Sequence, residues 1–228
     1  MSLNRNTLKY IAILAMVSDH VALSFIPGDT LLYFLMRFIG RLTAPIMCFF
    51  ISEGFYYTCS KWKYGVRLAA FALISQFAFT LFYNGSLNSL FFTQWSMIYT
   101  LLIGFCILCV YNKVSNKAIK WMAIAVLFAA SALGDWMVFA PAFILCFHVL
   151  RDDNRKKYVT FSIIAAAMTA IGFAFDEIWH IGMFLVIPLL LLYDGSKGSD
   201  SRFHKWVFYV FYPLHLIVIA VFRWSLLG

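Results

Sequence analysis

LKYIAILAMVSDHVALSFI, residues 8–26, is about as long and as apolar as a helix that crosses a lipid bilayer. The adjacent pair Asp19 and His20 interrupts this stretch. At about 1.5 Å per residue the pair lies about 17 Å from Leu8, slightly past the middle of a hydrocarbon core about 30 Å thick. An ionisable side chain at this depth is costly unless it is paired or hydrated, so the pair indicates a functional site or a buried ion pair.

The composition of the chain points the same way. Of its 228 residues 63% are hydrophobic and 12% are charged, against a typical charged fraction of about 25%. The mean hydropathy is +0.84. These values predict an all-α, polytopic integral membrane bundle with little of the chain outside the bilayer. The formal charge of +8 would suggest nucleic acid in a soluble protein, but basic residues gather in the cytoplasmic loops of membrane proteins, so we expect no nucleic-acid partner.

Nine apolar segments are candidate transmembrane helices, and eight is the alternative count because several segments are short. They cover residues 8–26, 31–57, 66–83, 90–111, 119–133, 136–150, 158–175, 178–193 and 206–227. We find no linker or repeat between them, so we expect a single domain over residues 1–228. The basic residues before the first apolar run resemble a secretion signal, but no cleavage site follows, so we expect an uncleaved first helix.

The distribution of charges predicts the orientation of these helices. With nine spans and a cytoplasmic N-terminus, 15 of the 18 basic residues fall in inner loops. They are Arg5, Lys9, Lys61, Lys63, Arg67, Lys113, Lys117, Lys120, Arg151, Arg155, Lys156, Lys157, Lys197, Arg202 and Lys205. The outer loops then hold Asp29, Asn84, Asn88, Asp135, Asp176 and Glu177. This segregation predicts that the N-terminus lies inside and the C-terminus outside.

Two arginines lie inside the second apolar segment, in LMRFIGRLTAP. Arg37 and Arg41 are four residues apart and therefore on one helix face. Counted from Leu31 they lie about 9 and 15 Å below the outer surface, and His20 lies about 12 Å below it. We therefore expect Asp19, His20 and both arginines at one level of the membrane.

A proline follows these arginines closely. Pro45 lacks the N–H that would bond to the carbonyl of Arg41, so the sequence predicts a kink beside the charged residues. The simplest interpretation of the charges is that Asp19 neutralises one arginine as a structural ion pair. That interpretation leaves a second arginine and a histidine at the same depth. An arginine also presents a planar fork that suits carboxylates and phosphates.

Two polar residues in the second and third segments are weaker candidates for the site. Glu53 lies near the inner end of the second segment, and we expect it to pair with Arg67 or Lys61. Gln76 is a buried amide that needs partners, and either core packing or substrate contact would supply them.

Two histidines are further candidates. His215, in FYPLHL, lies about 14 Å from the inner end of the last segment, close to the depth of His20. A hydrogen-bonded core histidine and a second site residue are the two interpretations. His180 lies at an expected outer loop, where an interfacial aromatic belt is the favoured interpretation and contact with an acceptor the alternative.

The chemistry of these residues favours proton transfer in the membrane. A neutral His20 imidazole can take a proton from an amine or hydroxyl that attacks an acyl carbonyl. Nearby arginines can stabilise a thioester or the developing oxyanion, and the lysine-rich inner loops can receive the phosphates of coenzyme A. Neither a metal-binding nor a nucleotide-binding motif is found, so no metal is expected. The residues alone do not exclude a transporter.

Several motifs together resemble the TraX family of bacterial membrane proteins. They are DH in the first segment, then RxxGRLTAP, SEGFYYT, KYGVRLAAFALISQ and the terminal YPLHL. The family is linked to acetylation of conjugative pilin and is similar to the transmembrane acyltransferase superfamily. The resemblance implies a multi-pass protein of the bacterial cytoplasmic membrane. It also implies that His20 is the catalytic base, with Asp19 and Arg37 or Arg41 around it and His215 as a second site residue.

The sequence therefore predicts an acyltransferase that moves an acetyl or similar group from cytosolic acyl-CoA to an amine or hydroxyl acceptor at the outer face. Arg37 and Arg41 are expected to position the donor, and Glu53, Arg67 and Gln76 to shape its route from the cytoplasm. The acceptor, whether peptide, glycan or small molecule, and the oligomeric state stay open. The alternatives are a proton-coupled transporter or flippase, with Asp19 and His20 as proton relay and the arginines as anion site, and a membrane scaffold.

Overall fold

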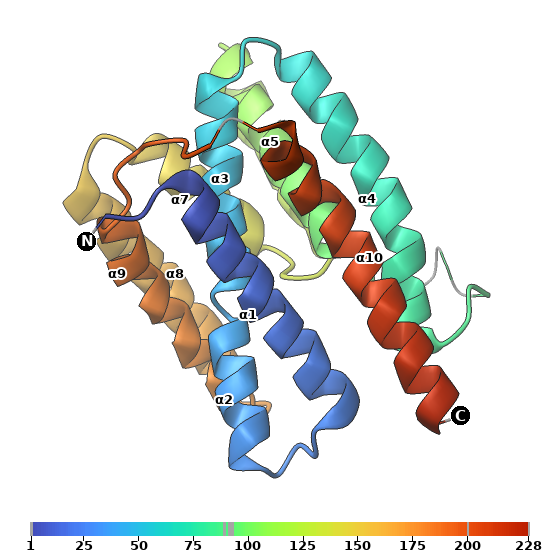
Figure 1. Ribbon diagram of the computed structural model, residues 1–228. Helices are drawn as coiled ribbons and strands as arrows, with labels where there is room; N and C mark the ends of the chain where they lie inside the picture. The colour runs from blue at the N-terminus through green and yellow to red at the C-terminus, as the bar shows by residue number, and fades with distance from the viewer. Residues whose placement is uncertain (1, 89, 91–93, 200, 228) are drawn as a thin grey trace. The chain divides into compact units, whose positions relative to one another are not determined.

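The computed structural model describes residues 2–88, 90, 94–199 and 201–227, and the chain in these ranges is helical (Figure 1). Ten α-helices and one 3₁₀-helix, η1, are found in them. Their bounds are α1 Arg5–Phe25, α2 Leu31–Gly40, α3 Thr43–Tyr57, α4 Lys61–Asn84, α5 Met97–Lys113, α6 Lys117–Ser131, α7 Phe139–Val149, α8 Asn154–Phe173, η1 Ile178–Leu185, α9 Val186–Leu191 and α10 Arg202–Leu227. Pairing of β type among the described residues is limited to two isolated bridges.

The nine predicted segments all contain helix, with three differences. The second segment is divided at Arg41 and Leu42, which lie between the end of α2 at Gly40 and the start of α3 at Thr43. The segment at 178–193 begins as the 3₁₀-helix η1 and continues as α9. The segment predicted at 90–111 starts among residues that lie partly outside the described ranges, and its helix α5 begins at Met97.

Within the described ranges, four segments are long and apolar enough to cross a membrane. They are Arg5–Phe25, Leu31–Tyr57, Lys61–Asn84 and Tyr209–Leu226. Shorter apolar helices cover Met97–Lys113, Phe139–Val149 and Ile178–Leu191. Large apolar side chains lie on the outside of the long helices, among them Leu14 at 71% and Trp62 at 80% exposure, which suits contact with lipid. The polytopic helical membrane fold is therefore confirmed, and the count of nine spans stays a prediction.

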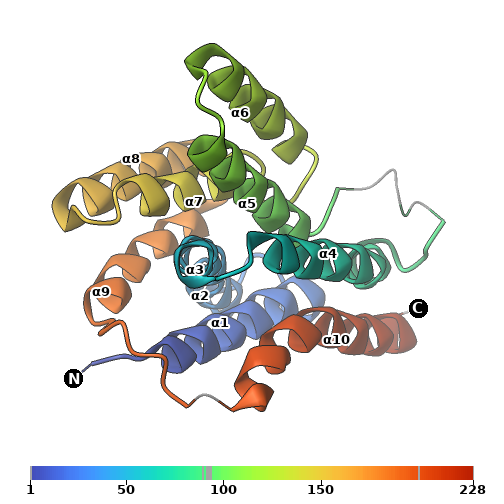
Figure 2. The same ribbon diagram turned by 90° about the horizontal axis from the view of Figure 1, so that it is seen from above.

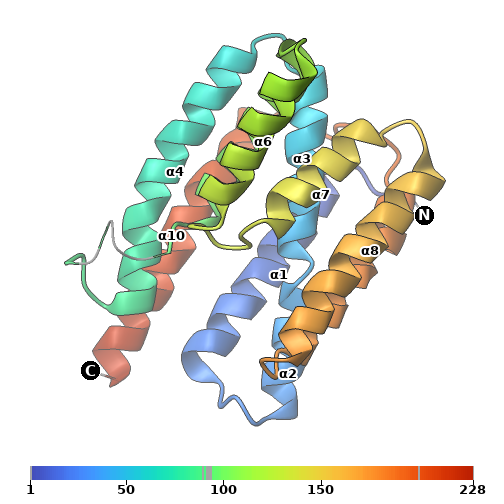
Figure 3. The same cartoon turned by 180° about the vertical axis from the view of Figure 1, so that it is seen from behind.

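The chain divides into two compact units, and the first contains α1, α2 and α10. It comprises Met1–Ile46, Ala78–Asn88 and Ala165–Gly228. In it α1 packs against both α2 and α10 (Figures 1 and 2). The helices α1 and α2 form an antiparallel hairpin, closed by the short loop at one end of both (Figure 3). Two hydrogen bonds hold this hairpin, from the Ser18 hydroxyl to the Met36 carbonyl and from the Thr43 hydroxyl to the Ala12 carbonyl, each 3.1 Å long.

The 3₁₀-helix η1 packs against α2 in the same unit. Gly182 of η1 lies directly against the carbonyl of Phe38, and a Cβ at this position would overlap that backbone. The close approach therefore requires glycine, and it brings the start of η1 to the side of α2 that carries the arginines.

The second unit comprises Met47–Phe77 and Ser89–Ile164. In it α5 lies beside both α6 and α7 (Figure 2). Aromatic rings fill its core, with the ring centroid of Phe161 at 4.9 Å from that of Phe143 and 5.6 Å from that of Phe147. That the two units form one domain over residues 1–228 stays a prediction.

Candidate functional site

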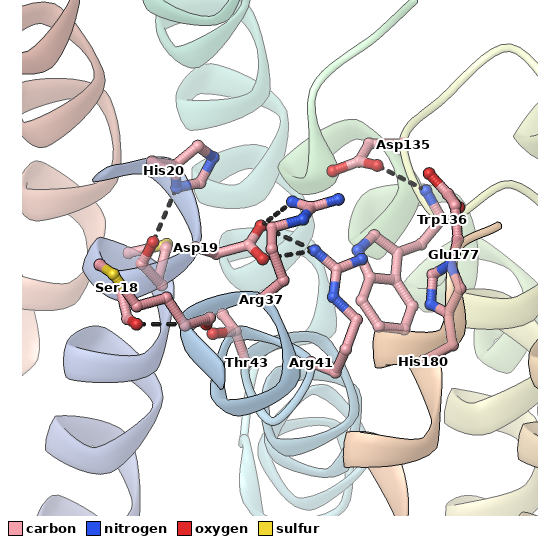
Figure 4. Close-up of polar contacts among 12 residues, drawn as sticks. Ser18, Asp19, His20, Arg37, Arg41, Thr43, Asp135, Trp136, Glu177 and His180 are labelled. Atoms are coloured by element: carbon pink, nitrogen blue, oxygen red, sulfur yellow. Dashed lines mark hydrogen bonds and ion pairs between the residues drawn. The ribbon is translucent and has the colours of Figure 1, made fainter. Parts of the chain in front are cut away.

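The neighbouring residues Asp19 and His20 face different helices. Successive residues on an α-helix point about 100° apart, since 3.6 residues complete one turn. Asp19 accordingly faces α2, where both arginines contact it (Figure 4). His20 faces α10, where it contacts His215. The two ionisable residues that define the first segment thus serve two separate contacts.

Asp19 is bonded to both arginines. The Nη1 of Arg37 donates to Oδ2 of Asp19 at 2.9 Å, and the Nη2 of Arg41 donates to Oδ1 at 2.6 Å and Oδ2 at 2.7 Å. The exposed fractions are 9% for Asp19 and 7% for each arginine. One carboxylate therefore faces two buried guanidiniums, and the cluster keeps a net positive charge. The sequence predicts these three residues at one depth, and the structure brings them together.

Gly40 makes this contact possible. A Cβ at Gly40 would overlap the side chain of Asp19, which lies directly against the backbone of α2. Helix α2 ends at this glycine, and Arg41 forms its C-cap with helical φ and ψ angles. The RxxGR spacing therefore provides two guanidiniums on one face and, between them, a residue small enough for a carboxylate to approach.

His20 is held by the backbone of its own helix rather than by Asp19. Its Nδ1 lies 2.8 Å from the carbonyl oxygen of Met16, and since a carbonyl only accepts, Nδ1 carries the proton. In the neutral ring Nε2 then has a free lone pair. This Nε2 makes no hydrogen bond with any residue in the described ranges, and the side chain is partly exposed. The imidazole also meets the ring of Phe82 edge to face, with centroids 5.1 Å apart.

His215 lies against His20. Its Nε2 is 3.3 Å from Nδ1 of His20, and its own Nδ1 donates to the carbonyl of Phe211 at 2.9 Å. The same logic gives His215 an unprotonated Nε2 that can accept a second, longer bond from His20. Residues predicted at similar depth in the first and last segments are thus in contact.

Two aromatic residues that the sequence analysis does not select complete the surroundings of Arg37. Its Cζ lies 5.0 Å from the ring centroid of Trp179 and 5.9 Å from that of Tyr33. These two rings meet edge to face at 5.4 Å. The spacing of Tyr33 and Arg37, four residues apart on a helix, could have indicated the first contact. The contact of Trp179 depends on the packing of η1 against α2, for which the sequence has no signal.

His180 is buried, with 5% exposed, and its Nε2 lies 2.8 Å from Oε2 of Glu177. The sequence favours a place in an interfacial belt for this residue. The structure gives it a carboxylate partner within the same turn (Figure 4), and its place in the belt stays a prediction.

The three weaker candidates, Glu53, Arg67 and Gln76, all lie in the second unit. Glu53 forms an ion pair of 2.6 Å with Arg151, a partner that the sequence analysis does not name. The guanidinium of Arg67 lies 5.2 Å from the ring centroid of Tyr64.

Gln76 anchors the chain that joins α4 to α5. Its Oε1 accepts from the Ser96 N–H at 2.9 Å, and its Nε2 donates to the carbonyls of Leu90 at 3.4 Å and Gln94 at 3.3 Å. The side chain is only 2% exposed. Its amide therefore finds its partners in the backbone, which supports the interpretation as a core residue.

The fold and these contacts define a polytopic helical membrane protein with a buried carboxylate–guanidinium cluster on one side of α1 and a histidine pair on another. The chain belongs to the TraX family, whose model, described as "TraX protein", matches residues 4–223. It is 31% identical over 230 residues to "Probable fimbrial assembly protein FimC, serogroup H1" of Dichelobacter nodosus, covering 93% of each chain. It is also 40% identical over 52 residues to "Uncharacterized protein RP591" of Rickettsia prowazekii (strain Madrid E), covering 23% of this chain and 19% of the relative. No solved structure matches it.

Proposed function

We propose that this protein is an acyltransferase of the bacterial cytoplasmic membrane that moves an acetyl or similar group from acyl-CoA to an amine or hydroxyl at the outer face. The link of the TraX family to pilin acetylation supports a transferase role. The name of the Dichelobacter nodosus relative supports a connection with fimbrial assembly. The observation that carries the proposal is the geometry of His20, whose Nδ1–H is bonded and whose Nε2 has no hydrogen-bond partner in the described part of the chain.

In this proposal His20 is the general base. Its Nε2 takes the proton of the acceptor amine or hydroxyl as the acceptor attacks the thioester carbonyl. The carbon–sulfur bond then breaks, the acyl group stays on the acceptor, and the coenzyme A thiolate leaves with the proton that His20 returns. While His20 is charged, its Nδ1–H donates to the Met16 carbonyl and to Nε2 of His215, which stabilises the imidazolium.

The two arginines supply positive charge near the base. Both guanidiniums contact Asp19, and two positive charges near the base favour negative charge that develops on an acyl oxygen. We propose that Arg37 and Arg41 position the donor or stabilise that oxygen, and that Asp19 fixes both guanidiniums. That Glu53, Arg67 and Gln76 shape the route of the donor from the cytoplasm stays a prediction.

A labelled-acetyl assay tests the base. Membranes that contain the wild-type chain or His20→Ala receive acetyl-CoA with a radiolabelled acetyl group, and the label transferred to other molecules is measured. We expect His20→Ala to reduce transfer by about 10²–10⁴-fold, the usual effect of losing a general base. His148→Ala is the matched control, because His148 is bonded to Asn112 in the second unit and should leave transfer unchanged.

Folding and donor binding are measured on the same variants. The unfolding temperature of purified His20→Ala and its calorimetric titration with acetyl-CoA should both match the wild type. Full transfer by folded His20→Ala would exclude the base role. Absence of acetyl-CoA binding by the folded wild type would exclude acetyl-CoA as the donor.

Proton-coupled transport is a second candidate, favoured by one observation. The 3.3 Å contact between His20 and His215 could pass a proton between two helices of the first unit. This function predicts flux into sealed vesicles, driven by a pH gradient, without covalent change to the cargo. Acyl transfer predicts covalent change without such flux, so one preparation of vesicles distinguishes the two functions.

A further inference from the structure

Arg37 is a buried guanidinium with most of its hydrogen-bonding capacity unused. Its exposed fraction is 7%, and its one hydrogen bond to the described protein is from Nη1 to Asp19. The Nε is buried without an acceptor in the described ranges. The Nη2 of Arg41 bonds both oxygens of Asp19. A buried donor without an acceptor is unfavourable, so a group that accepts from Arg37 is expected.

The unused donors of Arg37 share one edge of the guanidinium. The Nε–H and one Nη2–H point in parallel, and this edge binds the two oxygens of a carboxylate in the fork geometry typical of arginine. Figure 4 shows the guanidinium with one end against Asp19 and the other end directed away from it. The bond from Nη1 to Asp19 therefore fixes the orientation of the group and leaves this edge available.

A second buried donor lies beside this arginine. The Nε1 of Trp179 is buried and lacks an acceptor among the described residues, and its ring centroid is 5.0 Å from Cζ of Arg37. The indole is itself held by Tyr33. Two adjacent side chains from α2 and η1 thus both offer N–H groups that no described residue accepts.

We propose that Arg37 and Trp179 form a binding site for a carboxylate. The carboxylate accepts two hydrogen bonds from the Nε and Nη2 edge of Arg37. Trp179 covers the guanidinium and donates its indole N–H to the bound group. Glu177, an acidic side chain just before η1, is already bonded to His180.

The acceptor of the acyl group carries this carboxylate, a statement that rests on the proposed acyl transfer. It assigns Arg37 to the acceptor, so of the two arginines proposed above for the donor only Arg41 keeps that role. The long pantetheine arm separates the phosphates of coenzyme A from its thioester, so the phosphates lie far from His20 when the thioester meets this base. An acceptor that carries a carboxylate near its amine or hydroxyl could be held by Arg37 while its nucleophile meets the base. Binding itself is independent of transfer and can be measured without acyl-CoA.

Indole NMR tests the site directly. The protein is labelled with ¹⁵N-tryptophan, and the Nε1–H signal of Trp179 is assigned by its loss in Trp179→Phe, which keeps an aromatic ring over Arg37. Propionate is titrated as the carboxylate probe, and propionamide as the uncharged probe of the same skeleton. We expect the Trp179 signal to shift saturably with propionate and to stay in place with propionamide.

The arginine is tested by a matched pair of variants. Arg37→Lys keeps the charge but removes the planar edge, and should weaken propionate binding by at least about tenfold. Arg223→Lys is the control, since Arg223 also lies over an indole, Trp224 at 5.1 Å, whose N–H already donates to Leu81. Propionate affinity should be unchanged in Arg223→Lys, and the Trp224 signal should not move.

Three results would overturn the proposal. They are an unshifted Trp179 signal in the folded wild type, equal shifts with propionate and propionamide, and tighter binding of methyl phosphate, which would make this a phosphate site. If Arg37→Lys fails to fold, the comparison of the two probes on the wild type still decides. If propionate binds but no acyl transfer occurs, the acyltransferase proposal fails and the carboxylate site stands.

Discussion

Asp19 places one negative charge between two buried guanidiniums. Removing that charge without removing an arginine leaves two like charges in a poorly hydrated environment. Asp19→Asn keeps the size of the side chain and some hydrogen bonding, so it isolates the effect of the charge. We therefore expect Asp19 to stabilise the contact between α1 and α2.

We expect Asp19→Asn to lower the free energy of unfolding by about 3–5 kcal/mol, the usual cost of breaking a buried ion pair from one side. Denaturant unfolding of the purified protein in detergent measures it. Asp29→Asn, an exposed residue in the loop before α2, is the control and should leave stability unchanged. Equal stability of both variants would mean that the arginines do not need this carboxylate.

At this scale the sequence predicts the depth of the charges but only some of their partners. The fixed rise of an α-helix makes Asp19, Arg37 and Arg41 level, and they are in contact. The partner of His20 in its own helix, the Met16 carbonyl, is not predicted, because the choice between a backbone and a side-chain partner leaves no mark in the sequence. The contact of Trp179 with Arg37 is not predicted, because it depends on how η1 packs against α2.

Helices α1 and α2 approach each other at a glycine. Gly40 lies against Asp19, whereas Gly28, in the loop between the two helices, has open space where a Cβ would lie, with no described atom within 4 Å. Replacing either glycine with alanine therefore adds one methyl group, which meets Asp19 at Gly40 and open space at Gly28. The comparison measures how closely the two helices must pack for the charged cluster to form.

We expect Gly40→Ala to destabilise the protein by about 1–3 kcal/mol, as an extra methyl group does in a closely packed region. Gly28→Ala should have little effect. Thermal unfolding of the two variants, measured side by side, checks this prediction. If the two unfolding temperatures fell by the same amount, the close approach of α2 to Asp19 would not be needed for stability.

The sequence predicts the boundary of a helix where a particular side chain causes that boundary. Pro45 predicts an irregularity near Arg41, and the helix is interrupted at Arg41 and Leu42. The 3₁₀ conformation of η1 is not predicted, since an apolar run over 178–193 has the same composition in either kind of helix. Its close contact at Gly182 is a tertiary feature.

At the scale of the whole molecule, α10 has Asn88 near one of its ends and Ser199 near the other. It has 26 residues and is therefore about 39 Å long, enough to cross a bilayer. Near its C-terminal end, Trp224 donates to the carbonyl of Leu81, which places the loop that holds Asn88 at that end. Ser199 precedes the other end. The two loops should face opposite sides of the membrane.

Cysteine labelling tests this arrangement and the predicted orientation together. In a variant whose five native cysteines are replaced by serine, Asn88→Cys should react with an impermeant reagent added outside intact cells. Ser199→Cys should react only after the cytoplasmic side is opened. Labelling of both positions from one side would contradict a membrane-spanning α10, and the reverse pattern would contradict a cytoplasmic N-terminus.

The two contacts of α1 differ greatly in how much chain must exist before they form. Asp19 meets Arg41 after 22 further residues, whereas His20 meets His215 only after 195. During translation Arg37 and Arg41 are therefore synthesised while the first hairpin is entering the membrane, so they can bond to the Asp19 carboxylate early. The histidine pair is assembled much later. A nascent chain that stalls in between already holds Asp19 against Arg37 and Arg41, yet it lacks the histidine pair.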